Sequence, residues 1–342
     1  MFSWVLISRS TVDIIFTVTK KGRFFEHLVS SPENSPEIGG GEMIKTTFRS
    51  FMVFILVFFC VAGILVAKEK GPKIYISVDM EGIGAIVSSA QTGSGGFEYS
   101  KGRMLMTDEV NAAIEGCLEA GAGEIVVSDS HGNAQNLIPD EIHESALLIR
   151  CFPRSLLQME GIDETFDAAI FIGYHPKEGT PSANLSHTIW GSKIFELKIN
   201  GMTVSEAIFN AMVAGHFKVP VIMVAGDQHV AKEALKTFGP VETVITKESL
   251  GWLSAKSRHP KLICQEIKEK SKNAVQRIKE LKPYVVKTPV RMELTFKNIY
   301  DAEALSYLPW VKRKDGKTIL VETESIIDIN HFLTAFFSIN NR

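Results

Sequence analysis

Cysteine is scarce in this sequence, and its scarcity limits the kinds of site that the chain can hold. Only four of the 342 residues are cysteines, and no two of them form a C-x-x-C pair. This excludes a thiolate zinc site with the usual ligand spacing and a dense disulfide framework. Cys117 falls in a helical pattern, which predicts a core position. A bridge between Cys151 and Cys264 is compatible with the sequence if the protein is exported.

An excess of charge of either sign is also missing. The chain has 37 basic and 39 acidic residues, which gives a net charge of -2. Because basic residues are not in excess, no nucleic-acid partner is expected. The hydrophobic content is 45%, which is enough for a large core and excludes general disorder. The length suits one large domain or two smaller ones.

One long uncharged run is present near the N-terminus, from Phe51 to Ala67, and Lys45 and Arg49 precede it. A positive stretch, an apolar stretch and a small residue at the end are typical of a secretory signal peptide, here beginning at Met43. The run is also at the lower limit of what spans a bilayer, so an uncleaved anchor is the competing interpretation. We predict a signal peptide or anchor over residues 43–70, an exported protein, periplasmic or extracellular, and membrane contact only through this segment.

Residues 1–42 have a mixed composition with a Ser/Pro-rich stretch and a run of glycines. This pattern predicts no packed element. We interpret these residues as an unstructured, non-native upstream extension that results from a misassigned start codon.

The remainder of the chain alternates between apolar, β-branched runs and helical patterns. Three stretches are the strongest predicted strands: 73–78, 124–129 and 168–175. Because a strand–helix–strand order predicts parallel neighbours, the carboxyl ends of these strands should meet at one edge. We predict an α/β fold with a mostly parallel sheet flanked by helices, a Rossmann-like three-layer core over residues 73–284. A smaller α+β portion over residues 285–342 should pack on it.

Polar side chains that suit a metal ion follow these strands. Asp79 and Glu81 are two residues apart after the first strand, so both side chains leave an extended backbone on one face. His131 follows the second strand, His175 ends the third, and Glu206 begins a predicted helix. Carboxylates and imidazoles bind zinc and similar ions. Five ligands exceed the needs of one zinc, and a bridging carboxylate, Asp79 in preference to Glu81, would let the set hold two ions.

Several of these residues also have a purely structural interpretation. His131 could serve a turn or a helix cap, and Glu206 is favourable in the first turn of a helix without any metal. His229 is an alternative ligand, although Asp227 and His229 better fit a helix start and the rim of a site.

Several short sequence motifs, in the same order along the chain, resemble those of one known family. They are Ser77-Val-Asp-Met-Glu-Gly82, Gly102-Arg-Met-Leu-Met-Thr107, Ser128-Asp-Ser-His131, Gly173-Tyr-His175, Leu185-Ser-His187, Val204-Ser-Glu206 and Met223-Val-Ala-Gly-Asp227. From about residue 73 to its end, the chain resembles the D-aminopeptidase family of zinc metallopeptidases, typified by the dipeptide-transport-operon enzyme. The resemblance implies two zinc ions per subunit and a ring-shaped homo-oligomer, a decamer. It also implies metal ligands at Asp79, Glu81, His131, His175 and Glu206 and a catalytic residue at His187.

The resulting hypothesis is an aminopeptidase, a hydrolase of peptide bonds, that removes the N-terminal residue of short peptides through a water activated by two metal ions. A preference for D-amino acids such as D-Ala comes from the resemblance alone. His187 would move a proton or stabilise the oxyanion, and a nucleophilic role is the alternative. Two further functions remain open. One is a dinuclear hydrolase of another amide or a phosphoester, and the other is a non-catalytic exported protein that binds metal or peptide.

Overall fold

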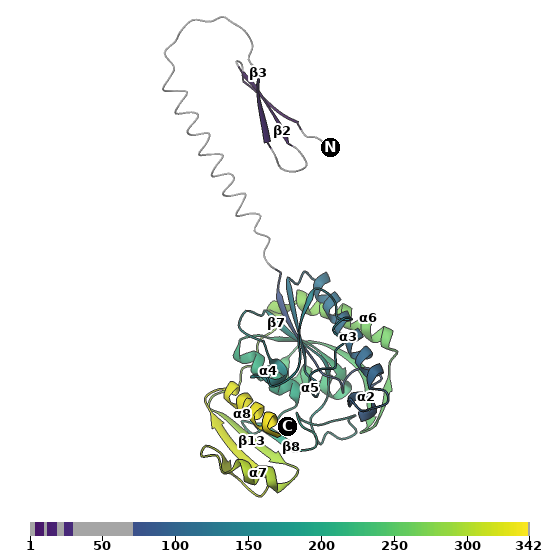
Figure 1. The fold of residues 1–342 in the computed structure, drawn as a ribbon, viewed down its shortest axis with the longest axis vertical. Coiled ribbons are helices and arrows are strands. Elements are labelled where there is room, and N and C mark those ends of the chain that lie inside the picture. Colours follow the sequence, from purple (N-terminus) through teal and green to yellow (C-terminus); the bar gives the residue numbers. More distant parts are fainter. Residues whose placement is uncertain (1–3, 10–11, 19–23, 30–70, 341–342) are drawn as a thin grey trace, which may run out of the picture. The chain divides into compact units, whose positions relative to one another are not determined.

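The structure is a computed structural model that describes residues 4–9, 12–18, 24–29 and 71–340 (Figure 1). Its internal contacts divide the chain into two compact units, Met1–Lys68 and Glu69–Arg342. The predicted signal peptide or anchor over residues 43–70 lies outside the described residues. Within the described part of the chain, no helix combines the length and the apolar character needed to cross a membrane.

The first unit contains a small antiparallel sheet in the order β1-β2-β3. Its strands are β1 (Trp4–Arg9), β2 (Val12–Val18) and β3 (Phe24–Val29). The composition of residues 1–42 predicts no packed element, so the presence of these three strands differs from the expectation. The β-branched and aromatic residues of β2 favour an extended backbone. The wider interpretation of residues 1–42 as an upstream extension stays a prediction.

The second unit is built on a seven-stranded sheet in the order β12-β11-β10-β7-β4-β5-β6. The strands are β4 (Lys73–Val78), β5 (Glu124–Asp129), β6 (Ala146–Ile149), β7 (Ala168–Tyr174), β10 (Val221–Asp227), β11 (Glu242–Gly251) and β12 (Ser254–Ser257). All neighbours are parallel except β11 and β12, which are antiparallel. The predicted mostly parallel α/β fold is therefore confirmed.

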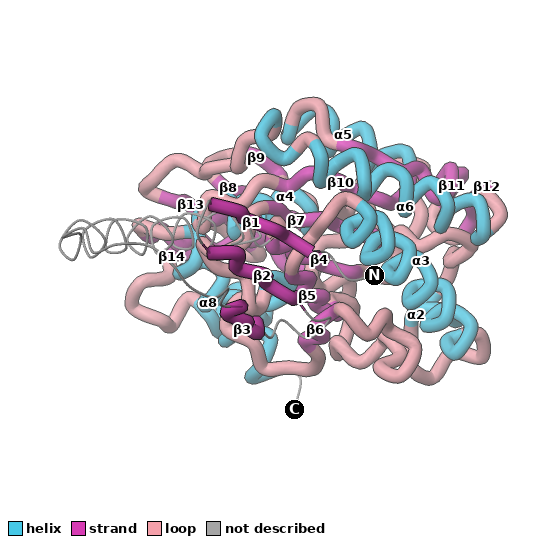
Figure 2. The backbone as a smooth tube through the Cα atoms, turned by 90° about the horizontal axis from the view of Figure 1, so that it is seen from above, coloured by secondary structure: helices cyan, strands magenta, loops and turns pink. Residues whose placement is uncertain are grey.

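Helices cover both faces of this sheet, which gives the predicted three layers (Figure 1). They are α2 (Ser89–Thr92), α3 (Tyr99–Glu119), α4 (Glu206–His216), α5 (Gln228–Phe238) and α6 (Pro260–Gln276). Helices α3 and α6 pack side by side, as Figure 2 shows, whereas α4 contacts α5. The central strands are buried on both faces, since every residue of β7 and β10 is buried. Continuous apolar runs, rather than alternating ones, are what such strands require.

A second, antiparallel sheet has the order β14-β15-β13-β8-β9. Its strands are β8 (Ile194–Ile199), β9 (Met202–Thr203), β13 (Val290–Phe296), β14 (Lys312–Arg313) and β15 (Thr318–Thr323). Two helices, α7 (Ile299–Leu305) and α8 (Ile326–Asn340), pack on it, and α8 also contacts α4. Strands β8 and β9 come from within residues 73–284, so this sheet is not confined to residues 285–342.

The three described cysteines are free thiols. Cys117 is buried on α3 in the predicted core position, and Cys151 and Cys264 are unbridged. The structure therefore does not form the disulfide that the sequence left open.

Candidate metal centre

Main-chain hydrogen bonds join the end of β4 to the end of β7. The Asp79 N–H donates to the carbonyl oxygen of Ile172 (2.8 Å), and the Gly82 N–H donates to that of Gly173 (2.7 Å). Asp79 and Glu81 are only 2% and 6% exposed. At Gly82 the two backbones come so close that a Cβ would lie 1.9 Å from the carbonyl oxygen of Tyr174. The two predicted carboxylate ligands are thus buried on a fixed backbone.

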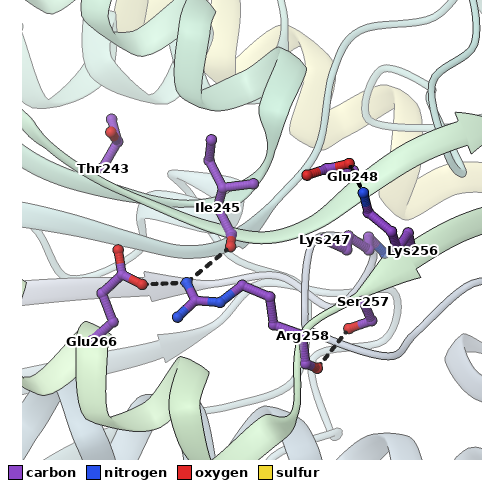
Figure 3. Close-up of a pocket in the computed structure, with 8 residues that line it drawn as sticks. All are labelled: Thr243, Ile245, Lys247, Glu248, Lys256, Ser257, Arg258 and Glu266. Atoms are coloured by element: carbon purple, nitrogen blue, oxygen red, sulfur yellow. Dashed lines mark hydrogen bonds and ion pairs between the residues drawn. The ribbon is translucent and has the colours of Figure 1, made fainter.

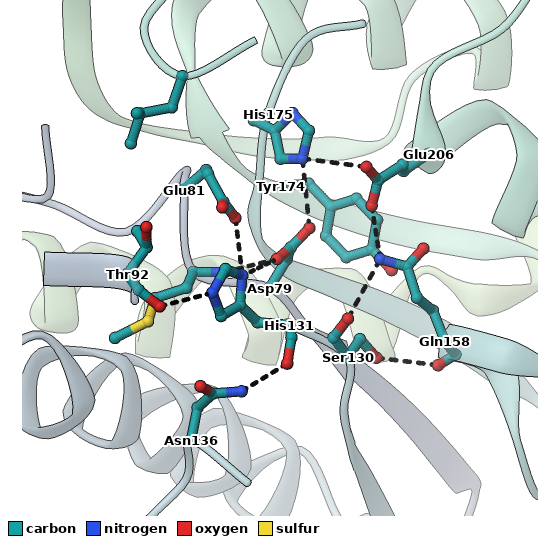
Figure 4. A network of polar contacts seen from close by, with 12 residues as sticks. Asp79, Glu81, Thr92, Ser130, His131, Asn136, Gln158, Tyr174, His175 and Glu206 are labelled. Carbon is teal, nitrogen blue, oxygen red and sulfur yellow. Dashed lines mark hydrogen bonds and ion pairs between the residues drawn. The ribbon is translucent and has the colours of Figure 1, made fainter. Parts of the chain in front are cut away.

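His131 follows β5 and reaches both carboxylates with one ring nitrogen (Figure 4). Its Nδ1 lies 3.1 Å from Asp79 Oδ1 and 3.0 Å from Glu81 Oε2. Its Nε2 lies 2.9 Å from the carbonyl oxygen of Thr92. Since a carbonyl oxygen can only accept, Nε2 carries a proton. Nδ1, on the side of the two carboxylates, is therefore the ring nitrogen that could bind a metal ion.

The loop that carries His131 is shaped by Asp129. The Asp129 carboxylate accepts the N–H groups of Asn136 (2.6 Å) and Leu137 (2.8 Å), and the Asn136 amide donates to the carbonyl oxygen of His131 (2.6 Å). His131 does lie in a turn, because its carbonyl oxygen also accepts the Ala134 N–H (2.8 Å), and the buried Asp129 carboxylate supports that turn.

His175 lies at the end of β7, between two acids that come from different elements. Its Nδ1 lies 3.0 Å from the carbonyl oxygen of Pro176, and its Nε2 lies 3.5 Å from Asp79 Oδ2 and 3.3 Å from Glu206 Oε1. The ring is 1% exposed. As for His131, one nitrogen is occupied by a carbonyl oxygen, which leaves the other directed at carboxylates.

Glu206 is the first residue of α4, where Ser205 caps the helix by accepting the Ile208 N–H (3.2 Å). A carboxylate in this position is favoured by the helix dipole. It also makes specific contacts, because Oε1 accepts the Ile189 N–H (2.6 Å) and Oε2 accepts the side-chain amide of Gln158 (2.5 Å). At 2% exposure, Glu206 is not a solvated helix-start residue.

His187 comes from a loop and stacks on His175, with ring centroids 4.2 Å apart and an interplanar angle of 14°. Its Nδ1 lies 2.9 Å from the carbonyl oxygen of Leu185, and its Nε2 lies 3.6 Å from Glu206 Oε1. The side chain is 22% exposed, against 1% for His175. His187 therefore occupies the solvent side of the cluster.

Three buried carboxylates and the neighbouring imidazoles shift one another's ionisation. Burial alone would lower the pKa of His131 and His175, but the charges of Glu81 and Glu206 outweigh it and hold both pKa values well above the ordinary range. Burial opposes ionisation of Glu206, yet His175 lowers its pKa to about 2. Burial and the charge of Glu81 raise the pKa of Asp79. The three carboxylates therefore strongly favour a positive charge at this site.

The donor atoms fit zinc. Asp79 Oδ2 and His175 Nε2 are buried side-chain atoms without a hydrogen-bond partner in the described part of the chain. Two groups have their ligand atoms within 4.8 Å of one another: Asp79, Glu81 and His175, and His175, His187 and Glu206. Buried polar atoms without a partner are destabilising unless something else binds them. A divalent cation such as zinc, which takes nitrogen and oxygen ligands, would bind these two atoms.

Comparison with known proteins shows the family of this chain. The family described as D-aminopeptidase matches residues 73–335. This chain belongs to the D-aminopeptidase family. A curated D-aminopeptidase of Bacillus subtilis (strain 168) is 35% identical over 246 residues, which are 72% of this chain and 89% of that protein. The family predicted from the sequence motifs is thereby confirmed.

A solved structure is similar to this D-aminopeptidase family member over most of its length. It is the Zn-dependent D-aminopeptidase DppA from Bacillus subtilis, described as a self-compartmentalizing protease. The TM-score is 0.76 at 32% identity, and the match covers 79% of this chain and 98% of that one. At this level of similarity the α/β fold of the two proteins is the same.

Sequence reasoning missed Gln158, which lies in a short 3-10 helix (Leu157–Met159) between β6 and β7. Besides holding Glu206, its side chain accepts a hydrogen bond from Asn210 (2.7 Å), and its main-chain oxygen accepts one from the Ser130 hydroxyl (2.9 Å; Figure 4). Nothing in the local sequence distinguishes this glutamine from a surface residue. Only the folded chain brings it to the ligand set.

The alternative ligand, His229, lies with Asp227 at the start of α5. Asp227 caps α5, where its Oδ1 accepts the N–H groups of His229 and Val230, both at 3.0 Å. Both residues therefore lie at the start of a helix, as the sequence indicated, and their place at the rim of a site stays a prediction.

A separate hollow of about 570 Å³ lies between β11, β12 and α6 (Figure 3). None of the six predicted site residues lines it. Four of its five charged side chains are paired, Lys256 with Glu248 at 2.6 Å and Arg258 with Glu266, and the fifth is Lys247. This hollow is therefore not part of the metal centre.

Proposed function

We propose that this protein is a zinc-dependent aminopeptidase that removes the N-terminal residue of short peptides, with a preference for D-amino acids such as D-Ala. The observation that carries the proposal is a pair of buried ligand atoms, Asp79 Oδ2 and His175 Nε2, which lie 3.5 Å apart and have no hydrogen-bond partner among the described residues. They lie in a cluster of acids and imidazoles in a chain whose relatives are described as D-aminopeptidases, one of them Zn-dependent.

Two zinc ions per subunit are proposed, held by Asp79, Glu81, His131, His175 and Glu206. Bound zinc supplies a Lewis acid and an activated water. The two oxygens of Asp79 support its role as the bridge, because Oδ1 faces His131 and Oδ2 faces His175. Gln158 and the Ile189 N–H orient Glu206, and the carbonyl oxygens of Thr92 and Pro176 fix the two histidine rings.

His187 is proposed to move a proton or to stabilise the oxyanion. Its Nδ1 is occupied by the Leu185 carbonyl oxygen, whereas Nε2 points to the cluster from the solvent side, where a peptide would enter. A nucleophilic role for His187 is the alternative. Proton transfer is preferred because a dinuclear site already supplies a nucleophile.

The assembly and the location are also proposals. A homo-oligomer, ring-shaped and decameric by family resemblance, is supported by the relative described as a self-compartmentalizing protease. Export to the periplasm or the cell exterior, with membrane contact only through residues 43–70, rests on the apolar run of the sequence.

A substrate panel tests the proposed function. Purified protein is first analysed for zinc and then assayed with D- and L-aminoacyl amides and a phosphoester. We expect zinc in the protein and cleavage of D-aminoacyl amides above the others. Cleavage of the phosphoester alone would instead support a dinuclear hydrolase of another class. Absence of zinc together with absence of turnover would support a binding protein.

A further inference from the structure

The loop Glu81–Ile86, which begins with a proposed zinc ligand, is held by side chains from distant parts of the chain. The Thr246 hydroxyl donates to the carbonyl oxygen of Gly82 (2.6 Å), and the Glu109 carboxylate accepts the Gly84 N–H (2.8 Å). The loop's own sequence, rich in glycine, does not fix its conformation. The hydrogen bonds from Thr246 and Glu109 fix the conformation of the loop instead.

Lys247 joins the two ends of this loop. Its ammonium group donates to the carbonyl oxygens of Glu81 and Ile86, the first and last residues of the loop. The side chain is 1% exposed. Removing an ammonium group from water is expensive, and main-chain carbonyl oxygens compensate for it less completely than a carboxylate does. A lysine in such a place is not explained by packing alone.

The contact is also long-range within the sheet. Lys247 lies on β11, which β10 and β7 separate from β4. The neighbouring Thr246 hydroxyl contacts the carbonyl oxygens of both Gly82 and Gly226 (2.6 and 3.1 Å), so it ties the loop to the end of β10 as well. Together Lys247 and Thr246 bind the β4 loop to the far half of the sheet.

We propose that Lys247, assisted by Thr246, is a positioning residue for Glu81: it fixes the main chain from which the Glu81 carboxylate reaches His131 and the zinc site. The proposal rests on the proposed zinc-dependent function. Among the described residues, the Glu81 carboxylate has one hydrogen-bond partner, His131 Nδ1 at 3.0 Å, so its direction depends on its backbone. Groups that orient a metal ligand typically contribute about 10–100-fold to metal affinity.

The test compares Lys247→Met with Lys256→Met in the full chain. Methionine keeps the length and apolar character of the side chain but removes the ammonium group. Lys256 lies on the adjacent strand, is exposed and pairs with Glu248 (2.6 Å), which makes it a matched control. We expect Lys247→Met to weaken zinc binding at least about tenfold by competition with a chelating dye, and Lys256→Met to leave it unchanged. A Lys247→Met variant that folds and binds zinc with wild-type affinity overturns the proposal.

A double-mutant cycle separates positioning from general loss of structure. In a Glu81→Gln background the ligand is already impaired, so we expect Lys247→Met to change zinc affinity less than about twofold. An unchanged effect in that background means that Lys247 does not act through Glu81. If Lys247→Met does not fold, Thr246→Val decides: a several-fold weaker zinc affinity supports the proposal, and wild-type affinity overturns it. A wild-type protein without zinc overturns the proposed function and this proposal together, whereas zinc bound equally by wild type and Lys247→Met overturns this proposal alone.

Discussion

Asp79 combines properties that are unfavourable for an ordinary carboxylate. It is 2% exposed, one of its oxygens has no hydrogen-bond partner, and a second buried acid lies two residues away. Burial and the charge of Glu81 both raise its pKa. Such a residue is tolerated where a cation compensates for it. The arrangement is thus explained by metal binding and not by the stability of the metal-free fold.

His187 provides the sharpest mutational test at the scale of single residues. His187→Ala should lower kcat by about 100-fold or more, because a group that transfers a proton or stabilises the oxyanion is removed, while zinc content stays at the wild-type level. Kinetics and metal analysis of the same preparation measure both quantities. His216→Ala, at the exposed end of α4, is the control. Full activity of His187→Ala would remove this residue from the mechanism.

Glu109 predicts a specific pH dependence of stability. Burial raises its pKa from 4.5 to about 8, and the Gly84 N–H and the charge of Lys247 only partly oppose this, while Asp108 adds to it. Because the folded state keeps the proton, the stability that Glu109 contributes is complete below its unfolded pKa and is lost as the pH rises through the folded pKa. The linkage slope for one proton is about 1.4 kcal/mol per pH unit.

Glu109→Gln removes this titration but keeps an oxygen for the Gly84 N–H. The free energy of unfolding of the variant should therefore rise relative to wild type between about pH 5 and pH 8. Urea titrations at several pH values measure the difference between the two proteins, in which other titrating groups cancel. A difference that does not vary with pH would contradict the assigned pKa.

At the scale of elements, the close approach of the β4 loop to the end of β7 is the main constraint. Gly82→Ala places a Cβ 1.9 Å from the Tyr174 carbonyl oxygen, which is backbone and cannot move aside alone. We expect a loss of roughly 1–3 kcal/mol in the free energy of unfolding, measured in the presence of a chelator. Gly95→Ala meets nothing within 4 Å and should change stability by less than about 0.5 kcal/mol. Equal stability of the two variants would show that the loop can be displaced.

The strands that end in ligands were predictable from sequence, but the contacts that hold them were not. Strands β4, β5 and β7 are apolar runs followed by polar residues, a pattern that places their ends at one edge. Strand β11 (Glu242–Gly251) contains Lys247 and Glu248, residue types that are unfavourable in a strand, so its full length has no clear signal in the sequence. Lys247 is accommodated there by carbonyl oxygens of a loop about 160 residues earlier. Such a long-range contact has no local signal.

At the scale of the whole molecule, all six predicted site residues lie in the second unit. This unit spans Glu69–Arg342 and contains both the parallel sheet and the antiparallel sheet. A chain that begins at Glu69 should therefore fold, bind zinc and hydrolyse peptides as the full chain does. Circular dichroism, metal analysis and kinetics of the two chains make the comparison. A truncated chain that folds but has lost zinc would show that the first unit contributes to the site.

The central claim is that zinc held by this cluster drives cleavage of an N-terminal D-residue. The most direct measurement is hydrolysis of D-Ala-D-Ala and of L-Ala-L-Ala by the same purified protein, with and without a chelator and after zinc is added back. We predict faster hydrolysis of D-Ala-D-Ala, its loss with the chelator and its recovery with zinc. Hydrolysis of D-Ala-D-Ala that persists after complete removal of metal would contradict the account, as would a protein with its full complement of zinc that cleaves neither dipeptide.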